Sequence, residues 1–279
     1  MRLRKEASVK LFIAVDREGI SGVVAERDAD REGQAAEAAM RLMRADLDAV
    51  LAGCDAAGAT EVVVCDAHDD GRSLTSEGLP RGVVLVGGSP APHSMLQGIG
   101  PGFDAALFVG YHARAGVGGA VLEHTWNYKV YSVTVGGLEV GEFGIGALLA
   151  GHFGVPAVYV SGDDKLAAEA RALVPGIVTT VVKHGITRHA AGLLPPDECR
   201  ARMRDDVARA LRSGDRTRPL VWDGSPLRLT FTRVEYCDLA SFCPGVLRLD
   251  GRTVEIPGAT FEEIYRSFLA CLLLSELPG

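Results

Sequence analysis

The sequence predicts an α/β fold: a mostly parallel sheet flanked by helices, with a smaller C-terminal α+β layer. Apolar runs of strand length recur over the first two thirds of the chain and are continuous, which is typical of parallel strands buried on both faces. An amphipathic stretch of helical period separates the first two runs. The last third orders its helices and strands differently. With 279 residues, the chain can bury a substantial core.

The first predicted unit is a strand, a helix and a second strand. The strands are "KLFIAVDREG" at 10–19 and "EVVVCDAHDD" at 61–70. The stretch between Glu32 and Gly58 has helical periodicity, and Gly53 or Gly58 can end the helix. Its apolar positions are Met40, Met43, Leu47, Val50 and Leu51. This order predicts a parallel βαβ unit.

Two further apolar runs extend the predicted sheet. They are "AALFVGYHAR" at 105–114 and "PAVYVSGDD" at 156–164, and both end in polar side chains, as the first two runs do. Ligands bind at the carboxyl ends of the strands in such sheets. We therefore expect the functional site at this edge, where Asp163 and Asp164 could hold an ammonium group.

The last third predicts a smaller layer. We expect an α/β metal-binding catalytic domain over residues 1–192 and an α+β domain over 193–279, divided at a stretch marked by Gly and Pro. A discontinuous second domain is also compatible with the pattern. The expected elements of the smaller domain are a helix at 196–212, strands at 218–236 and 246–256, and a helix at 261–275.

Composition and charge limit which partners and which cellular location we expect for the protein. The formal charge of −7 argues against nucleic acid or an anionic membrane as a partner. The first apolar run breaks at Asp16 without a cleavage site of small residues, so we expect a strand behind a loose leader and not a signal peptide. No apolar stretch reaches the length of a membrane span. Six cysteines without a C-x-x-C pair indicate reduced thiols, and we expect a cytoplasmic protein.

Two acidic residues leave the first strand on the same side of the chain. Asp16 and Glu18 alternate with Arg17. A lone D-x-E is more often a solvated strand end, with the arginine as an ion-pair partner. His68 and His112 follow the second and third apolar runs, and either histidine alone is more often a hydrogen-bonded loop residue than a ligand. Their shared position at one edge of the predicted sheet favours a functional site.

Further candidates lie in the middle of the chain. Glu142 precedes an apolar run that should be helical, and an acidic residue there can equally complement the helix dipole. Glu139 is a similar candidate on composition alone. His124, in "VLEHTWNY", follows no periodic pattern and could be a loop residue that stacks on Trp126.

Metal ions would explain why these acidic residues gather. Two close carboxylates repel one another, and one stays protonated unless a cation intervenes. Imidazole and carboxylate together are ligands that zinc accepts. Asp16, Glu18 and Glu142 supply −3 against +4 for two ions, and a bridging hydroxide would balance the charge. In two-metal hydrolases the ions stand ~3.5–4 Å apart, so one carboxylate, here Asp16, can bridge both.

Beyond single residues, five segments stand out: "VDREGISGV", "DAHDDGRS", "GYHARAG", "EHTWNY" and "EVGEFGIGALLAGHFGVPAVYVSGDD". They resemble the signature segments of the zinc-dependent D-aminopeptidases, cytoplasmic peptidases often associated with dipeptide-transport operons. The resemblance covers residues 11–164, in order and with compatible spacing. One departure is Ala14, which stands where the family's first motif, S-x-D-x-E-G, has serine. It removes a hydroxyl behind the ligands and bears on substrate preference.

The resemblance implies a binuclear zinc site, with two ions per subunit. It also implies that His124 is the catalytic histidine, which is described in the family as a nucleophile. A general acid/base role for His124 is chemically simpler, because activated water already supplies a nucleophile. The implied ligands are Asp16 as the bridge, Glu18 and His112 on one ion, and His68 and Glu142 on the other.

The predicted function is that of a metallo-aminopeptidase that removes an N-terminal residue, a D-amino acid, from short peptides. Ring-shaped homodecamers are known in the family, so the resemblance also implies a large homo-oligomer. A dinuclear esterase or amidase that acts on another small molecule is one alternative. A non-catalytic ligand-binding module is another, although the Gly-rich stretch at 87–100 lacks both the G-x-G-x-x-G spacing and the P-loop lysine.

Overall fold

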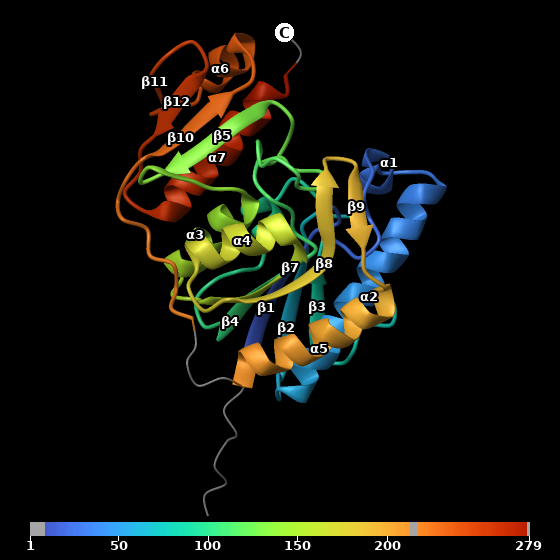
Figure 1. Cartoon of the computed structure of the whole chain (residues 1–279). Coiled ribbons are helices and arrows are strands. Elements are labelled where there is room, and N and C mark those ends of the chain that lie inside the picture. Colours follow the sequence, from blue (N-terminus) through green and yellow to red (C-terminus); the bar gives the residue numbers. More distant parts are fainter. Residues whose placement is uncertain (1–8, 213–216, 278–279) are drawn as a thin grey trace, which may run out of the picture.

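The computed structural model describes residues 9–212 and 217–277 (Figure 1). The leader expected before the first strand therefore lies outside the described residues. Within them, the chain forms one large sheet covered by helices on both faces and a second, smaller sheet. This arrangement confirms the predicted fold class.

Seven strands of the described residues form the large sheet, which is parallel except at one edge. Their order is β3-β2-β1-β4-β7-β8-β9, and only β9 runs antiparallel to its neighbour. The four predicted apolar runs are its strands β1, β2, β4 and β7. The bounds are β1 (Lys10–Val15), β2 (Glu61–Asp66), β3 (Val83–Val86), β4 (Ala105–Val109), β7 (Ala157–Asp163), β8 (Val178–Thr187) and β9 (Ala190–Leu193).

The register brings three strand ends to the same level. Val15 of β1 pairs with Asp66 of β2 and with Val109 of β4. The backbone N–H of Asp16 then donates to the carbonyl oxygen of Val109 at 2.8 Å. The loops after β1, β2 and β4 consequently leave the sheet at one edge, as the sequence predicts.

Helices cover both faces of the large sheet. On one face α2 (Gln34–Ala56), which is the predicted amphipathic helix, packs beside α5 (Pro196–Arg212). On the other face lie α3 (Glu142–His152) and α4 (Asp164–Leu173). Alternate residues of β1 serve the two cores, with Leu11, Ile13 and Val15 towards α2 and α5, and Phe12 and Ala14 towards α3.

The smaller sheet of the described residues is antiparallel, in the order β11-β12-β10-β5-β6. It lies at the upper left of Figure 1, with its helices. Two of its strands, β5 and β6, come from the middle of the chain, and β5 pairs with β10. The bounds are β5 (Val130–Val135), β6 (Leu138–Glu139), β10 (Leu227–Phe231), β11 (Leu247–Arg248), β12 (Thr253–Ile256), α6 (Val234–Ala240) and α7 (Phe261–Ser275).

The smaller sheet is built partly from residues outside 193–279, the segment expected for the second domain, for which the sequence also allows a discontinuous arrangement. Strands β5 and β6 belong to this sheet, and α5 packs on the large sheet. The expected strand at 218–236 is shorter, because Val234–Ala240 turns into α6 and buries Cys237 and Ala240 next to α7. These differences arise from long-range pairing, which local periodicity does not encode. None of the described helices has the length and apolar character needed to cross a membrane.

Candidate metal centre

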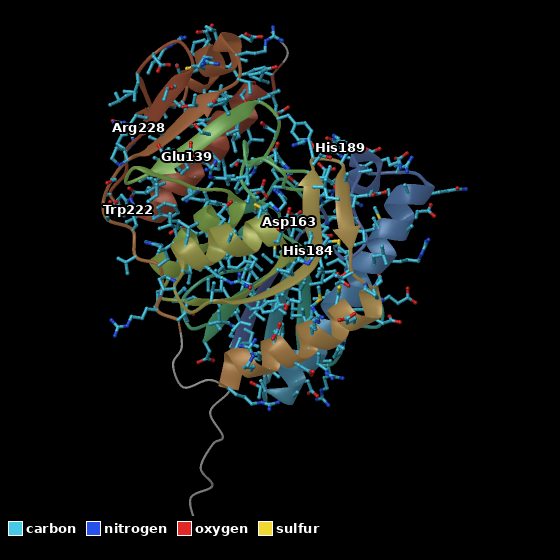
Figure 2. All side chains as sticks on the ribbon, viewed as in Figure 1. Glu139, Asp163, His184, His189, Trp222 and Arg228 are labelled. Atoms are coloured by element: carbon cyan, nitrogen blue, oxygen red, sulfur yellow. The ribbon has the colours of Figure 1, made fainter. Side chains whose placement is uncertain are left out.

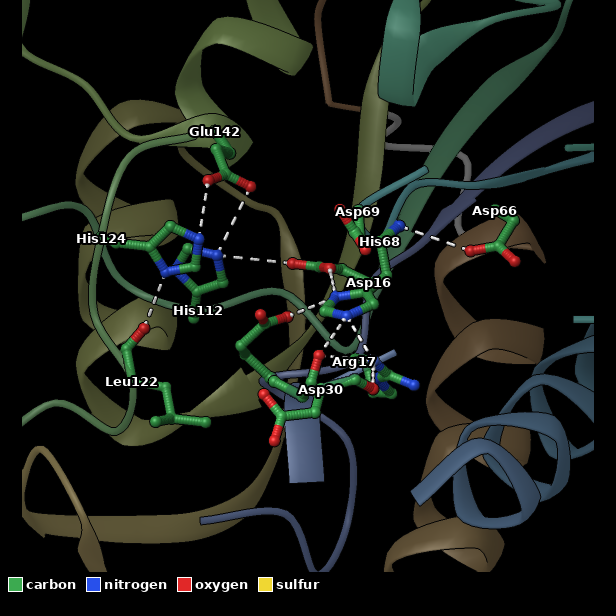
Figure 3. A network of polar contacts seen from close by, with 12 residues as sticks. Asp16, Arg17, Asp30, Asp66, His68, Asp69, His112, Leu122, His124 and Glu142 are labelled. Carbon is green, nitrogen blue, oxygen red and sulfur yellow. Dashed lines mark hydrogen bonds and ion pairs between the residues drawn. The ribbon is translucent and has the colours of Figure 1, made fainter. Parts of the chain in front are cut away.

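Four of the predicted ligands lie on the loops that follow β1, β2 and β4 (Figure 3). Asp16 and Glu18 follow β1, His68 follows β2 and His112 follows β4. All four side chains are buried, with at most 6% of each residue exposed. The fifth, Glu142, begins α3, whose N-terminus points its backbone dipole at this acid.

The loops after β1 and β4 approach one another backbone to backbone. The N–H of Gly19 donates to the carbonyl oxygen of Gly110 at 2.7 Å. A Cβ atom on Gly19 would lie 1.8 Å from the carbonyl oxygen of Tyr111. Only glycine therefore allows the loop of Asp16 and Glu18 to reach the loop of His112.

The first set of ligand atoms, the β1–β2 group, consists of Asp16, Glu18 and His68. The Nδ1 atom of His68 lies 3.0 Å from Oε2 of Glu18 and 3.4 Å from Oδ1 of Asp16. One ligand atom from each of the three residues lies within 4.8 Å of the others, so the group is compact enough to surround a metal ion.

The second set, the β4–α3 group, consists of His112, His124 and Glu142, with Asp16 at its border. The Nε2 atom of His112 lies 3.4 Å from Oε2 of Glu142 and 3.4 Å from Oδ2 of Asp16. The Nε2 atom of His124 lies 3.6 Å from Oε1 of Glu142. Figure 3 shows Asp16 between the two groups, with one carboxylate oxygen directed at each.

This grouping differs from the one that the resemblance implies. There, Glu18 shares an ion with His112, and His68 shares the other with Glu142. In the structure His68 lies with Glu18, and His112 lies with Glu142. The reason is the strand order: β1 is flanked by β2 and β4, so the histidines that follow these two strands approach the β1 loop from opposite sides. In both arrangements Asp16 is the shared residue.

Backbone carbonyls fix the tautomers of two histidines. The Nδ1–H of His112 donates to the carbonyl oxygen of Ala113 at 3.0 Å, and that of His124 donates to Leu122 at 2.9 Å. Each histidine then presents an unprotonated Nε2 to the carboxylates when neutral. The two rings are stacked, with their centroids 4.0 Å apart. His124 is therefore oriented towards the metal centre and does not stack on Trp126.

Two facing atoms of the site lack a hydrogen-bond partner. Oδ2 of Asp16 and Nε2 of His112 are both buried and unpartnered, although they lie only 3.4 Å apart. When His112 is neutral, its unprotonated Nε2 and the carboxylate of Asp16 are two facing acceptors, an arrangement that costs free energy unless a proton or a metal cation lies between them. The mixture of imidazole nitrogen and carboxylate oxygen is a donor set that suits zinc.

The pKa values of these buried acids and histidines depend on burial and on the charges that face them. Burial raises the pKa of Asp16 to about 7, and the charge of Glu18 adds to this effect. Burial lowers the pKa of His112, but Glu142 raises it to about 10. Burial alone would raise the pKa of Glu18 and Glu142, yet the facing histidines hold both below their ordinary range. Burial and the charge of His112 lower the pKa of His124, which favours its neutral form.

A buried lysine that the sequence analysis did not single out holds the loop of Glu18. Lys183 on β8 is fully buried and donates its Nζ to the carbonyl oxygens of Glu18 at 2.6 Å, Ile20 at 3.1 Å and Val23 at 2.6 Å. Burial lowers the pKa of Lys183 to about 8, while Asp163 and Glu18 raise it. The available signal was a charged residue inside the apolar run "TTVVKHG", because a buried charge requires partners.

Arg17 supports His68 from the other side of the loop. Its Nη2 lies 2.6 Å from Nε2 of His68 and donates to the carbonyl oxygens of Ala29 and Asp30 at 2.5 and 2.6 Å. Only 1% of Arg17 is exposed, so it is not the solvated ion-pair partner that a lone D-x-E suggests. The chain around α1 (Glu26–Ala29) is thereby anchored next to the β1–β2 group.

Other acidic and histidine residues lie outside the metal centre (Figure 2). Asp163 accepts three backbone N–H groups, and Asp164 accepts the N–H of Gly185 and pairs with the neighbouring Lys165, and neither lines the cavity at the metal centre. His184 and His189 are exposed on the β8–β9 hairpin. Glu139 forms an ion pair with an arginine and is half exposed.

The metal centre opens into a cavity of about 560 Å³, a size typical of a small-molecule site. Its floor contains four of the five predicted ligands and His124. Five acidic side chains line it, Glu26, Asp30, Asp69, Asp70 and Glu276. Apolar side chains also line it, Trp126 and the α7 leucines Leu269, Leu272 and Leu273. The C-terminal layer therefore closes a site that the large sheet begins.

Known proteins are similar to this chain in both sequence and architecture. Residues 9–270 match the model of a peptidase family described as D-aminopeptidase. A D-aminopeptidase of Bacillus subtilis (strain 168) is 33% identical over 271 residues, which cover 96% of this chain and 97% of that protein. The solved structure of the zinc-dependent D-aminopeptidase DppA from Bacillus subtilis, described as a self-compartmentalizing protease, is similar with a TM-score of 0.93. That match has 32% identity and covers 97% of this chain and 99% of the other.

Proposed function

The chain belongs to the D-aminopeptidase family, and we propose that it is a metallo-aminopeptidase that removes an N-terminal D-amino acid from short peptides. The observation that carries this proposal is a pair of ligand groups at the floor of an acidic cavity, with Asp16 of one group 3.4 Å from His112 of the other. The activity named for the curated relative and the zinc dependence named for the solved structure support the same substrate class and metal.

Five side chains would hold two zinc ions per subunit. Asp16 would serve both, because its two oxygens face His68 and His112 separately. The unpartnered contact between Asp16 and His112 supports the presence of a cation at this point. The ligands would be Asp16, Glu18 and His68 for one ion and Asp16, His112 and Glu142 for the other, while His124, the third member of the β4–α3 group, is assigned a different role below.

Zinc would supply Lewis acidity, which activates water near neutral pH and polarises a carbonyl oxygen. The residues of the chain bind and orient the substrate. The acidic side chains that line the cavity favour the positively charged amino group of a peptide, and the leucines of α7 give its first side chain a surface to contact. The N–H of Trp126 donates to Oε1 of Glu142 at 2.6 Å, which holds the loop of His124 over the floor.

We assign proton transfer to His124. Its Nδ1–H is bonded to a backbone carbonyl, so its free Nε2 can accept a proton and pass it to the leaving amine. Burial lowers its pKa, which supports a neutral ring near pH 7. A nucleophilic role would instead require an acyl-imidazole and a second hydrolytic step.

An esterase or amidase with the same ligands would differ only in its substrate pocket. A panel of D- and L-aminoacyl anilides beside simple esters separates these activities, because only the aminopeptidase should require a free amino group. A non-catalytic module should hold no stoichiometric zinc after dialysis.

Location and assembly form part of the same proposal. We propose a cytoplasmic enzyme, since the six cysteines are free and buried in the described chain. We further propose that it assembles as a homo-oligomer, a decamer by family resemblance. The self-compartmentalizing character named for the solved structure supports assembly, and light scattering of the full chain measures the number of subunits.

The central test compares two stacked histidines. His112→Ala removes a proposed ligand and should lower bound zinc and nearly abolish turnover of D-aminoacyl substrates. His124→Gln should keep the zinc and lower kcat by about 10²–10⁴-fold. Zinc by mass spectrometry, kcat and circular dichroism distinguish these outcomes, with the exposed His184→Ala as a control. Full zinc and normal rates in His112→Ala would remove His112 from the site.

A further inference from the structure

A second cavity of about 360 Å³ adjoins the metal centre. His124 and Tyr128 line both cavities, so the histidine assigned to proton transfer stands between them. A peptide whose scissile amide lies at His124 would place its N-terminal residue in the first cavity. The remainder of the peptide would then enter the second cavity.

The two cavities differ in charge. Apart from the metal ligands, the wall of the first carries five carboxylates, two of them Asp30 and Asp70, and a single arginine. The second contains Arg114 and Arg188, beside two glutamates. The first cavity is therefore net acidic and the second is formally neutral, and a peptide with free ends would place its positive amino end in the first and its negative carboxyl end beside the arginines of the second.

Arg114 reaches the second cavity from the loop of a proposed metal ligand. It follows His112 by two residues, and its backbone N–H donates to Oε2 of the partly buried Glu169 at 3.0 Å. Its Nη2 atom lies 2.6 Å from Oε2 of Glu139, whose side chain is 46% exposed. Ion pairs of this exposed kind are weak, so the guanidinium can bind another carboxylate in addition.

Arg188 enters the second cavity from the turn between β8 and β9. Its guanidinium carbon lies 4.8 Å from the centroid of the Tyr128 ring. One nitrogen lies 3.0 Å from Oε2 of Glu123 and another 3.3 Å from Oε1 of Glu26, a residue of the first cavity. Stacking on Tyr128 holds the planar group at the boundary of the two cavities, and its five N–H donors exceed what these contacts use.

We propose that Arg114 and Arg188 bind the C-terminal carboxylate of the peptide substrate and so select short peptides with a free carboxyl end. This inference rests on the proposed aminopeptidase activity. Guanidinium groups suit the recognition because their N–H groups match the two oxygens of a carboxylate. Both residues are substrate-binding residues, and neither takes part in bond cleavage.

The size of the second cavity sets the length that is selected. A compact space of 360 Å³ is about 7 Å across, the cube root of its volume, and two extended residues span about 7 Å. A carboxylate one or two residues beyond the scissile bond would therefore reach the arginines. Longer peptides would have to leave this carboxylate contact unmade.

The test uses two substrates that differ only at the carboxyl end, D-alanyl-glycine and D-alanyl-glycinamide. With the zinc-loaded enzyme we expect kcat/KM for the acid to exceed that for the amide by about tenfold or more, mainly through KM. In Arg114→Gln and Arg188→Gln, this ratio should fall towards one. Zinc content and circular dichroism should match the unsubstituted enzyme, and Arg188→Lys should restore part of the ratio.

The control is Arg209→Gln on α5, which removes an exposed arginine that pairs with Asp206 and should leave the ratio unchanged. An unsubstituted enzyme that hydrolyses acid and amide equally would overturn this inference while leaving the proposed function intact. Equal losses on both substrates in the arginine variants would also overturn it, since they indicate a structural role. If neither substrate is hydrolysed, and no D-aminoacyl anilide either, the proposed function fails and this inference falls with it.

Discussion

The two ligand groups of the metal centre are built from different kinds of structure. The β1–β2 group comes from two adjacent strand ends, and buried cations hold its loop from below: Lys183 bonds three backbone carbonyls, and Arg17 contacts His68. The β4–α3 group combines a strand end, a loop and a helix N-terminus. Backbone carbonyls and the stacking of His112 on His124 hold it in place.

This difference suggests that the two groups have different roles at the site. A group held by hydrogen bonds to buried charges resists displacement, because each lost bond leaves a buried carbonyl unsatisfied. A group that includes a loop histidine facing two cavities is better suited to contact the substrate. We therefore expect variants of the β1–β2 group to act through metal and stability, and variants of the loop of His124 to act through turnover.

The largest effect is expected for Asp16→Asn, because Asp16 belongs to the β1–β2 group and also faces His112 of the β4–α3 group. The substitution keeps the size of the side chain and removes the charge that faces both histidines. Both zinc ions should be lost on dialysis, with a loss of turnover well above the roughly 100-fold typical of residues behind the ligands. Zinc stoichiometry by mass spectrometry and kcat/KM check this prediction.

Asp66→Asn is the matched control for that variant. Asp66 accepts the N–H of Leu74 at 2.7 Å and of His68 at 3.4 Å, and so orders the loop without facing the ligand atoms. Its effect on zinc should be clearly smaller. Retention of one ion in Asp16→Asn would show that Asp16 serves a single group and would contradict the shared role.

Lys183→Met should weaken the β1–β2 group and leave the β4–α3 group unchanged. It leaves three carbonyl oxygens of the loop after β1 without their donor, so the free energy of unfolding should fall by about 3 kcal/mol. Zinc affinity should fall by about 10–100-fold for the ion at Glu18 alone. Denaturant unfolding and metal titration measure the two effects.

Lys165→Met provides the comparison, since Lys165 is partly exposed and pairs with its neighbour Asp164. This variant should change the free energy of unfolding by less than about 1 kcal/mol. An equal loss of both ions in Lys183→Met would mean that the two groups are not supported independently.

A smaller effect is expected from pH in the metal-free protein. The pKa of His112 is about 10 in the folded chain against an ordinary 6.5, so its stabilising contribution is complete below pH 6.5 and is lost as pH rises to 10. Asp16, with a pKa of about 7 against 3.8, loses its contribution between pH 4 and 7. The lowered pKa values of Glu18 and Glu142 act only on acidification.

The Tm of the chelator-treated protein should therefore fall between pH 7 and 10, on the order of 5 °C. Zinc competes with these protons, so its addition should raise the Tm more at pH 9 than at pH 6. Thermal unfolding followed by circular dichroism at both pH values measures this. A zinc effect that does not depend on pH would show that the ions bind elsewhere.

Much of the metal centre could be predicted from local pattern. Continuous apolar runs indicate parallel strands, and the residues just beyond them must meet at one edge, which predicts that Asp16, His68 and His112 lie close together. Glu142 was harder, because an acidic residue at a helix start has an equally good structural explanation. His124 was identified through the family resemblance alone.

Other features depend on contacts between distant parts of the chain. The hairpin of β5 and β6 joins a sheet whose remaining strands lie about 90 residues further on, and β10 alone determines that partnership. The role of Lys183 depends on β8 lying next to the loop after β1, because only then can its Nζ donate to the carbonyl oxygen of Glu18. The second cavity likewise exists because the β8–β9 turn carries Arg188 to Tyr128.

Local periodicity is enough to predict the fold class, the edge of the sheet that carries the chemistry, and the residue types that gather there, because it reflects strand burial and strand direction. It does not reveal which histidine faces which carboxylate, which cations hold the loops, or where a substrate can enter. Those properties depend on contacts between residues more than a hundred positions apart, such as the hydrogen bond from the Lys183 side chain to the carbonyl oxygen of Glu18.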